Sequence, residues 1–337
     1  MKLNNSIEFL KLIYSYKFNK IRTPLKTLHM DVSNACNLNC EMCEWTYLRG
    51  ETNSFPDLNV LKKRIDEAKK LGLKHVIIGS CSEPLLYSKI EELVDYLKNK
   101  NIKIEINTNL SFPYKISKRL KNIDHLIVSI DAPDEETYKK IRIGGNFNQI
   151  INNIKKLKKY NLKIQLSYVI QRNNYNKIVD FVNLAKKLKV DSICLGSLVH
   201  LKEDIYNRVK LNQKQFQDLQ KELKNAKILA DKLKLNHNLN QKFDIRFITN
   251  PVYPCYTTYF SLFIKSNGDV FPCCISIADK NLKIGNIYKE SLKKIWLGEK
   301  FQKMRNILKK ESKPYVCQRC VGENFNKKIY KYAKYFI

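Results

Sequence analysis

The amino-acid sequence predicts an α/β fold, namely a partial (β/α)6 barrel of the TIM type followed by a small domain with a β-hairpin and short helices. Six short β-branched runs alternate with amphipathic segments, which indicates parallel strands joined by right-handed helical crossovers. After about residue 248 this alternation stops and a hairpin pattern follows. We therefore expect a helical extension at 1–24, a barrel at 25–247 and a second domain at 248–337.

The expected barrel elements follow one another in a regular order. Strands are predicted at 28–33, 75–79, 102–108, 125–130, 163–170 and 192–199, where β-branched and other apolar residues cluster. Helices are predicted between them from the apolar spacing of segments such as LNVLKKRIDEAKKLG and YNKIVDFVNLAKKLKV. A long polar helix from about 209 to 236 closes this region. In such barrels the catalytic groups gather at the carboxyl ends of the strands.

The two ends of the chain have patterns of their own. The first 24 residues predict an amphipathic helix, which we expect to pack across the bottom or side of the barrel rather than on a membrane. Near the other end, YFSLFIKSNGDVFPCC predicts a hairpin that turns at 266–269, with Gly268 in the left-handed conformation. Short helices are expected near SLKKIW and FQKMRNILKK.

Composition limits the class of protein. Among the 337 residues no apolar run is long enough for a membrane span, and the amino terminus lacks a signal-peptide pattern, so we expect a cytoplasmic protein. The net charge of +30 comes mainly from lysine, since only ten of the 62 basic residues are arginine. Because lysine lies on the polar side of nearly every expected helix, this charge favours solvated helix faces over a nucleic-acid partner.

In a reducing compartment, ten cysteines indicate metal ligands or reactive thiols rather than disulfides. Three of them, Cys36, Cys40 and Cys43, share one loop after the first predicted strand. Three thiolates can hold three irons of a four-iron cubane and leave the fourth iron open. A structural site is usually closed by four ligands instead. A zinc loop with three cysteines is the alternative interpretation.

The C-x3-C-x2-C spacing resembles the hallmark of the radical S-adenosylmethionine (SAM) superfamily, and the similarity continues along the barrel. GSCSEP at 79–84 resembles the Gly-Gly-Glu-Pro motif that binds the methionyl amine, and NTN at 107–109 resembles Thr-Asn-Gly with Leu110 in place of glycine. SIDAP at 129–133, followed by Tyr138, Arg142, Gly144 and Gly145, resembles the segment at the fourth strand. Met42 stands where relatives usually have an aromatic residue against adenine.

The resemblance implies a site, its cofactors and a reaction. Cys36, Cys40 and Cys43 would hold a catalytic [4Fe-4S] cluster. The residues expected to contact SAM are Met42, Gly79, Glu83, Pro84, Asn109, Ser129, Asp131 and Arg142. An electron donor of flavodoxin or ferredoxin type would reduce the cluster, SAM would be cleaved, and the 5′-deoxyadenosyl radical would remove hydrogen from a substrate held in the barrel.

Four cysteines of the second domain suggest a further cluster. Cys255, Cys273, Cys317 and Cys320 resemble the shortened SPASM or "twitch" domain, which carries one auxiliary [4Fe-4S] cluster. A zinc site is the alternative. Cys274 could replace Cys273, but alternation along a strand would send the two side chains to opposite faces, and the Gly-x4-Cys spacing favours Cys273.

Cys81, Cys194 and His200 belong to neither cysteine set. Small buried core residues are the first interpretation of the two cysteines. The second is that one of them gives a hydrogen atom to a substrate radical, as an epimerase would need. His200, just past the sixth predicted strand, is a candidate acid or base.

The motifs do not separate the possible reactions. An oxidoreductase-type enzyme that oxidises or epimerises a carbohydrate or aminocyclitol is favoured, since the four-cysteine auxiliary pattern resembles that of aminocyclitol dehydrogenases. Side-chain modification in a peptide or protein is the alternative. A metal-binding scaffold without activity is the contrasting class, and the presence of all three loop cysteines and Glu83 argues against it.

Overall fold

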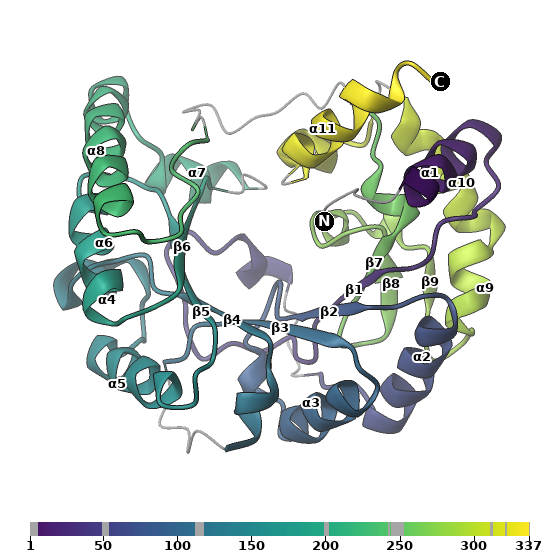
Figure 1. Cartoon of the computed structure of the whole chain (residues 1–337), viewed down its shortest axis with the longest axis horizontal. Coiled ribbons are helices and arrows are strands. Elements are labelled where there is room, and N and C mark those ends of the chain that lie inside the picture. Colours follow the sequence, from purple (N-terminus) through teal and green to yellow (C-terminus); the bar gives the residue numbers. More distant parts are fainter. Residues whose placement is uncertain are drawn as a thin grey trace.

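A computed structural model describes residues 6–48, 54–111, 118–198, 202–241, 243, 253–310, 313–320 and 322–336. Within these residues the barrel strands pair in parallel, in the order β6-β5-β4-β3-β2-β1. They are β1 (Thr27–Met30), β2 (His75–Ile78), β3 (Lys103–Thr108), β4 (His125–Ser129), β5 (Ile164–Val169) and β6 (Ser192–Gly196). Strands β1 and β6 are not paired with each other, so the predicted partial barrel is confirmed (Figure 1).

Helices cover the outer face of the curved sheet (Figure 1). They are α2 (Leu58–Lys70), α3 (Ile90–Asn99), α4 (Glu135–Ile141), α5 (Phe147–Lys158), α6 (Ile178–Lys187) and α8 (Gln213–Lys232). The short helix α7 (Glu203–Val209) lies beyond the carboxyl end of β6 instead (Figure 1). Several begin where a side chain caps the first turn; Asp57, for example, accepts a hydrogen bond from the backbone of Val60 (2.9 Å).

The long helix expected at about 209–236 is present as α8, and the short helix α7 that precedes it was not predicted. The chain leaves the helical conformation after Val209 and starts again at Asn212. Asn212 and Gln215 form a capping box, in which each side chain accepts a hydrogen bond from the other residue's backbone (2.8 and 3.0 Å). This local signal fixes the start of α8 at Gln213.

The two faces of the barrel strands differ in burial. In β2, Val76 and Ile78 are fully buried beneath the helices, while His75 and Ile77 alternate with them and are only partly buried. The partly buried set points into the lumen, and in β1, β3 and β4 it includes His29, Glu105 and His125. The core therefore lies between the sheet and the helices, and the lumen is polar.

The hairpin expected near the carboxyl terminus is present and extends the barrel sheet. β7 (Ser261–Ile264) pairs in parallel with β1 and antiparallel with β8 (Asp269–Phe271), which pairs with β9 (Gly285–Asn286). Gly268 has φ +82° in the turn, as predicted. Helices α9 (Leu292–Leu297), α10 (Glu299–Lys309) and α11 (Glu323–Ala333) follow. One continuous sheet thus crosses the expected domain boundary, whose position stays a prediction.

The amino-terminal helix α1 (Ser6–Phe18) lies elsewhere than expected. It packs on the segment that precedes β7 and on α11, through a cluster that includes Leu12, Tyr256, Tyr259 and Ile329 (Figure 1). Packing across the bottom or side of the barrel was wrong, because the apolar partners of α1 are supplied by the other end of the chain. No helix in the described ranges is long and apolar enough to cross a membrane.

Gly268 provides a test of the hairpin. A β-carbon at this residue would lie 2.4 Å from the ring of Tyr288, and the positive φ disfavours any L side chain. We expect Gly268→Ala to lower the free energy of unfolding by about 1–3 kcal/mol in urea denaturation. Gly196→Ala is the control, because nothing lies within 4 Å of its added β-carbon. Equal stability of the two variants would contradict the turn.

His29 makes stability depend on pH. Burial in the lumen lowers the pKa of His29 from its usual value of 6.5 to about 4, with the neighbouring His75 acting in the same direction and Glu105 opposing it. Between these values the unfolded chain binds a proton that the folded chain does not, so stability falls as pH falls from about 6.5 toward about 4.

We expect His29→Gln to flatten this dependence by up to about 1.4 kcal/mol for each pH unit. Urea unfolding of both proteins at several pH values from neutral downward measures it. Near pH 7.5 both side chains are uncharged, and the difference found there is the baseline. Parallel curves for the two proteins would rule the effect out.

Candidate active site and auxiliary cysteine site

A cavity of about 320 Å³ opens at the carboxyl ends of the barrel strands. Its walls come from the loops that follow β1, β2, β3 and β4 and from the ends of β5 and β6. The residues that line it include Cys36, Cys40, Met42, Cys43, Gly79, Glu83, Asn109, Ser129 and Arg142. Four separate sequence motifs therefore meet in one space, as expected for chemistry at this end of a barrel.

The loop with the three thiols is tied to the end of α4. The backbone of Asn39 donates to the carbonyl of Ile143, and that of Glu41 donates to Ile141, both at 2.9 Å. Within the loop, the backbone of Cys43 donates to the carbonyl of Cys40 (3.0 Å). These bonds hold the cysteine loop above the strand ends without using any thiol.

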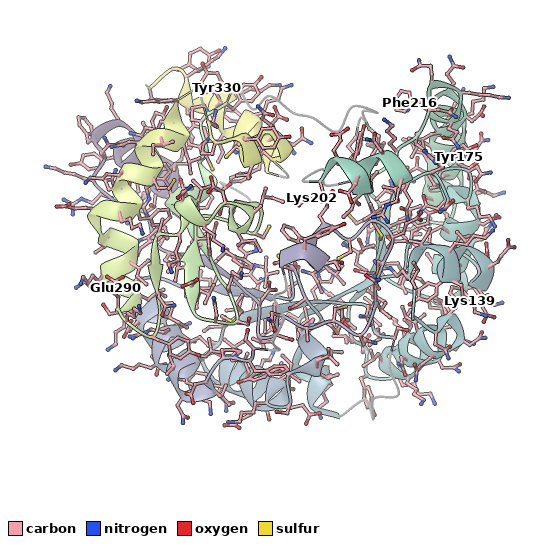
Figure 2. The ribbon with its side chains drawn as sticks, turned by 180° about the vertical axis from the view of Figure 1, so that it is seen from behind. Lys139, Tyr175, Lys202, Phe216, Glu290 and Tyr330 are labelled. Atoms are coloured by element: carbon pink, nitrogen blue, oxygen red, sulfur yellow. The ribbon has the colours of Figure 1, made fainter. Side chains whose placement is uncertain are left out.

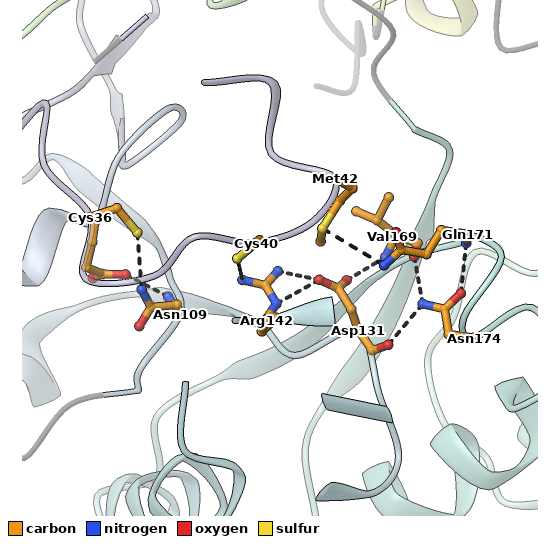
Figure 3. A network of polar contacts seen from close by, with 10 residues as sticks. Cys36, Cys40, Met42, Asn109, Asp131, Arg142, Val169, Gln171 and Asn174 are labelled. Carbon is orange, nitrogen blue, oxygen red and sulfur yellow. Dashed lines mark hydrogen bonds and ion pairs between the residues drawn. The ribbon is translucent and has the colours of Figure 1, made fainter. Parts of the chain in front are cut away.

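A buried ion pair lies beneath Cys40 (Figure 3). The Arg142 guanidinium binds the Asp131 carboxylate, with Nε donating to Oδ2 at 2.7 Å, and its Nη1 points at Cys40 Sγ at 3.8 Å. Burial raises the pKa of the Cys40 thiol to about 11, and the charge of Arg142 opposes this rise. Arg142 is thus the positive charge that favours a thiolate at Cys40.

Asp131 is held rigidly. It has φ +56°, and its other carboxylate oxygen accepts a hydrogen bond from the backbone of Val169 (2.6 Å) on β5. Asn174 donates to the Asp131 carbonyl at 2.9 Å (Figure 3). The end of β4 is therefore locked to the end of β5, and Arg142 has one fixed anchor.

Asn109 connects the first thiol to the third strand. Its side-chain amide donates to Cys36 Sγ at 3.5 Å and to Asn37 Oδ1 at 2.9 Å. Its backbone donates to Glu83 Oε2 at 2.7 Å, while Thr108 donates to Glu83 Oε1 at the same distance. Glu83 is buried, which raises its pKa to about 7, and these hydrogen bonds act against the rise. Glu83 thereby fixes the loop that carries Asn109.

Gly79 is required by a close approach of two backbones. With φ +88°, it would place a β-carbon 2.5 Å from the carbonyl of Asn107 and 2.7 Å from Pro84. Leu110 has φ +52° at the position where the resembling motif has glycine, so the substitution keeps a left-handed backbone. This conformation costs an L residue about 1–2 kcal/mol, and burial of the Leu110 side chain in the core offsets the cost.

Met42 and Ser129 occupy opposite walls of the cavity. Gln171 approaches Met42 Sδ with its amide at 4.0 Å (Figure 3), and Ser129 lies next to Ser167 in the β4–β5 register. In the described residues, the Oε1 of Gln171 and the Oγ of Ser82 are buried without a hydrogen-bond partner. Both atoms are available to a polar ligand.

The auxiliary cysteines are also brought together. Burial raises the pKa of Cys255 to about 11 and that of Cys317 to about 12, and the nearby Cys273 adds to both. Cys320 is raised in the same direction by burial and by Cys255 and Cys273. Four thiols close enough to repel one another as thiolates need a cationic group between them.

Cys274 faces a different neighbour from Cys273. The pKa of Cys81 is raised by burial, then by Asp31 and Cys274, whereas Cys273 affects the other three auxiliary thiols. We expected alternation along a strand to separate Cys273 from Cys274, which was wrong. Strand β8 ends at Phe271, and both cysteines lie in the bend that follows. The different surroundings of Cys273 and Cys274 therefore come from this bend and not from the alternation of side chains along a strand.

The structure places Cys81 and Cys194, the two cysteines outside the cluster sets, at different distances from the cavity. Cys81 lines the main cavity and, with Asp31, Trp45 and Lys265, a smaller neighbouring one. Cys194 lies on β6 below the cavity, where its thiol is partly buried. His200 lies outside the described residues. Sequence reasoning overlooked Asn37, Gln171 and Asn174, whose only signal is an amide side chain in a loop next to a strand end.

The thiols fit iron–sulfur clusters. In the ranges that the structure describes, no three His, Cys, Asp or Glu side chains converge closely enough to hold one metal ion. A single zinc would need ligands about 2.3 Å from one centre, whereas each thiolate of a four-iron cubane binds a different iron and stands further from its neighbours. The donor sets are sulfur alone, with an Arg and an Asn side chain directed at the first set.

Comparison with known proteins assigns the chain to a family. Residues 30–185 match the Radical SAM superfamily, and residues 255–321 match the SPASM iron–sulfur cluster-binding domain. The chain therefore belongs to the radical SAM superfamily and carries a SPASM domain. SAM and two [4Fe-4S] clusters are the cofactors of these two domains.

Among its relatives, the chain is 30% identical to a probable GTP 3′,8-cyclase of Methanococcus aeolicus over 173 residues, 49% of this chain and 57% of that protein. The match thus spans little more than half of the cyclase. An AdoMet-dependent heme synthase of Methanosarcina barkeri is 26% identical over 316 residues, 86% of this chain and 87% of that one.

Solved structures share the fold. SuiB from Streptococcus suis bound to S-adenosylmethionine has a TM-score of 0.70 at 20% identity, over 91% of this chain and 76% of that one. The protein anSMEcpe with bound AdoMet has a TM-score of 0.65 at 18% identity, over 90% of this chain and 85% of that one. At these identities the similarity concerns the fold alone.

The Asp131–Arg142 pair allows a stability test. Asp131→Ala leaves the guanidinium buried without its carboxylate, so we expect a loss of about 3–5 kcal/mol in the free energy of unfolding. The control is Glu136→Ala on α4, which breaks the exposed pair with Lys140 and should change stability little because water screens it. Urea denaturation of the apoprotein compares them, and similar losses would show that Arg142 does not depend on Asp131.

Proposed function

We propose that this protein is a radical SAM oxidoreductase that removes a hydrogen atom from a small polar metabolite of carbohydrate or aminocyclitol type. One observation carries the proposal. The cavity that contains Cys36, Cys40 and Cys43 continues along a wall of hydroxyl and amide side chains. These are Ser80, Ser82, Asn107, Ser167 and Ser197. Such groups suit a ligand with many hydroxyls better than an apolar side chain.

Each residue has a role that its position supports. Cys36, Cys40 and Cys43 would hold the catalytic cluster, with Asn109 and Arg142 hydrogen-bonded to two of the sulfurs. Gly79 and Ser129 would bound the SAM pocket, with Pro84 packed against Gly79, and Met42 would lie against the adenine because it lines the same cavity. Glu83 and Asp131 would act as positioning residues, since both carboxylates are engaged by backbone or arginine donors.

When bound, the reduced cluster and SAM supply a 5′-deoxyadenosyl radical, which can remove hydrogen from an unactivated carbon. The chain contributes position and exclusion. Trp45 and Leu198 line the cavity together with Met42, and these apolar side chains limit the entry of water and of competing hydrogen donors. The polar wall would set which carbon of the substrate faces the radical.

The second set of cysteines would hold the auxiliary cluster. Four thiols are available, those of Cys255, Cys273, Cys317 and Cys320. We propose Cys273 rather than Cys274 as the ligand because Cys273 lies close enough to raise the pKa of the other three thiols. Four thiolates leave no iron open, so this cluster would pass electrons rather than bind substrate. We also propose a reducing compartment such as the cytoplasm, because thiols that hold iron–sulfur clusters have to stay out of disulfides.

Production of 5′-deoxyadenosine tests the enzymatic assignment. Anaerobically reconstituted protein with SAM and dithionite should form it, and Cys40→Ala should abolish it because the catalytic cluster loses a ligand. Cys194→Ala is the control and should retain formation, since this thiol lies apart from the three cysteines. Failure of the unaltered protein to form any 5′-deoxyadenosine would favour a metal-binding scaffold.

Deuterium transfer then tests the substrate class. Polyols, sugars and aminocyclitols deuterated on carbon should pass deuterium to 5′-deoxyadenosine, detected by mass spectrometry. Peptides deuterated at the α- and β-carbons are the comparison set. Transfer from peptides alone would replace the metabolite assignment by side-chain modification, the alternative that the sequence left open.

A further inference from the structure

One side of α1 is apolar and exposed. Ile7, Leu10, Tyr14 and Phe18 recur at helical spacing and are 61%, 56%, 38% and 56% exposed. A shallow groove runs along them, and it is also lined by Lys11, Lys17 and Arg22. Next to it, α11 and the residues after it expose Tyr332, Tyr335 and Phe336, and the ring of Phe336 lies 5.9 Å from that of Phe9. An apolar surface of this extent usually marks an interaction site.

The opposite side of α1 rests on the auxiliary cysteine site. The ring of Tyr16 contacts that of Tyr256, with centroids 5.3 Å apart, and Tyr256 directly follows Cys255. The same segment is fixed from two other helices. The backbone N–H of Cys255 donates to the carbonyl of Leu308 in α10 at 3.0 Å, and the backbone N–H of Tyr256 donates to Asn326 Oδ1 in α11 at 2.9 Å. Helix α1 and the contact between Tyr16 and Tyr256 therefore lie between the exposed groove and Cys255, a proposed cluster ligand.

The charge around the groove is positive. From residue 6 to residue 22 the chain has four cations, Lys11, Lys17, Lys20 and Arg22, and one carboxylate, Glu8. Glu8 is paired with Lys26, so it does not offset the exposed cations. On α11, Lys328 and Lys331 add to the same sign. An occupant of this surface should be acidic and should present apolar groups to the helix.

We infer that this surface, called here the α1 face and defined by Ile7, Leu10, Lys11, Tyr14, Lys17 and Phe18, docks a small acidic electron-transfer protein of flavodoxin or ferredoxin type. The inference rests on the proposed function, in which Cys255 holds the auxiliary cluster. The donor gives up one electron and the auxiliary cluster accepts it, so this cluster is where electrons enter the enzyme.

The size and charge of the α1 face favour an electron-transfer protein over a second copy of this chain and over a membrane. Electron-transfer complexes are small and steered by charge, and a patch formed by two helices suits them. A second copy of this chain would bring the same positive face against itself, which opposes docking. An anionic membrane would accept the charge, but it would give no reason for the apolar groove to lie over Cys255 rather than elsewhere on a chain of net charge +30.

Binding of oxidised flavodoxin to the reconstituted holoenzyme tests the α1 face, with Kd measured by calorimetry at low and at physiological ionic strength. Lys11→Glu/Lys17→Glu should raise Kd about tenfold or more at low ionic strength, because attraction becomes repulsion. Leu10→Ala/Phe18→Ala should raise Kd with little change in its salt dependence. These side chains are exposed, so the variants should fold.

The matched control changes the same charge on the other side of the molecule. Lys214→Glu/Lys221→Glu alters two exposed lysines of α8, which lies across the molecule from α1 (Figure 1) and on the opposite wall from Tyr330 of α11 (Figure 2). The Kd of this control variant for oxidised flavodoxin should stay within about twofold of the Kd of the unaltered protein. A loss equal to that of the α1 pair would show a general charge effect and overturn the inference.

Stopped-flow reduction separates docking from cluster damage. Reduction by flavodoxin hydroquinone should slow about tenfold in Lys11→Glu/Lys17→Glu, whereas dithionite, which needs no docking surface, should reduce all variants at one rate. Unchanged reduction by flavodoxin, combined with loss of binding to phosphatidylglycerol vesicles, would assign the α1 face to a membrane instead. The production of 5′-deoxyadenosine with dithionite reports on the proposed function independently of either result.

Discussion

The buried ion pair between Asp131 and Arg142 is the interaction on which the catalytic end of the barrel depends. Thiolates collected in a buried loop need a positive charge nearby, and Arg142 is directed at Cys40 from below. A buried guanidinium is itself costly unless a carboxylate and further hydrogen bonds hold it. Asp131 provides the carboxylate that binds Arg142, and it accepts a further hydrogen bond from the backbone of Val169. The position of the Cys40 sulfur therefore depends on the pairing of β4 with β5.

The same region keeps its shape through backbone conformations that most residues avoid. Gly79, Leu110 and Asp131 have positive φ where the chain leaves β2, β3 and β4. Only Gly79 lacks the steric cost, and it is also the residue at which two backbones approach most closely. Leu110 and Asp131 are held by burial and by hydrogen bonds respectively. The strand ends are thus preorganised, which a site that controls a reactive radical requires.

The auxiliary region is joined to the barrel by backbone as well as by side chains. β7 continues the barrel sheet beside β1, the strand from whose end the catalytic loop starts. Cys274 and Cys81 approach each other between the two cysteine sites, near Asp31 at the end of β1. Because one sheet carries both sites, their separation is set by strand pairing rather than by a linker. The amino-terminal helix completes this unit by packing on Tyr256 and Tyr259, which follow Cys255 in the chain.

Local patterns in the sequence determined the element types and the cofactor class. The β-branched runs located all six barrel strands, usually to within one or two residues at the start and up to three at the end, because burial on the helix side imposes that composition. The spacing of Cys36, Cys40 and Cys43 identified the superfamily since three ligands of one cluster lie in one loop. Gly268 marked the hairpin because only glycine adopts its φ without cost.

Only the tertiary structure decided which distant side chains meet. Nothing in the local pattern shows that Asn109 would bind Cys36, that Cys274 would lie near Cys81, or that α1 would pack on Tyr256. Each of these contacts joins segments more than seventy residues apart, and each depends on how the sheet curves and on where β7 is added. A periodic pattern fixes which face of a helix or strand is apolar, but the partner of that face is set by the packing of the whole chain.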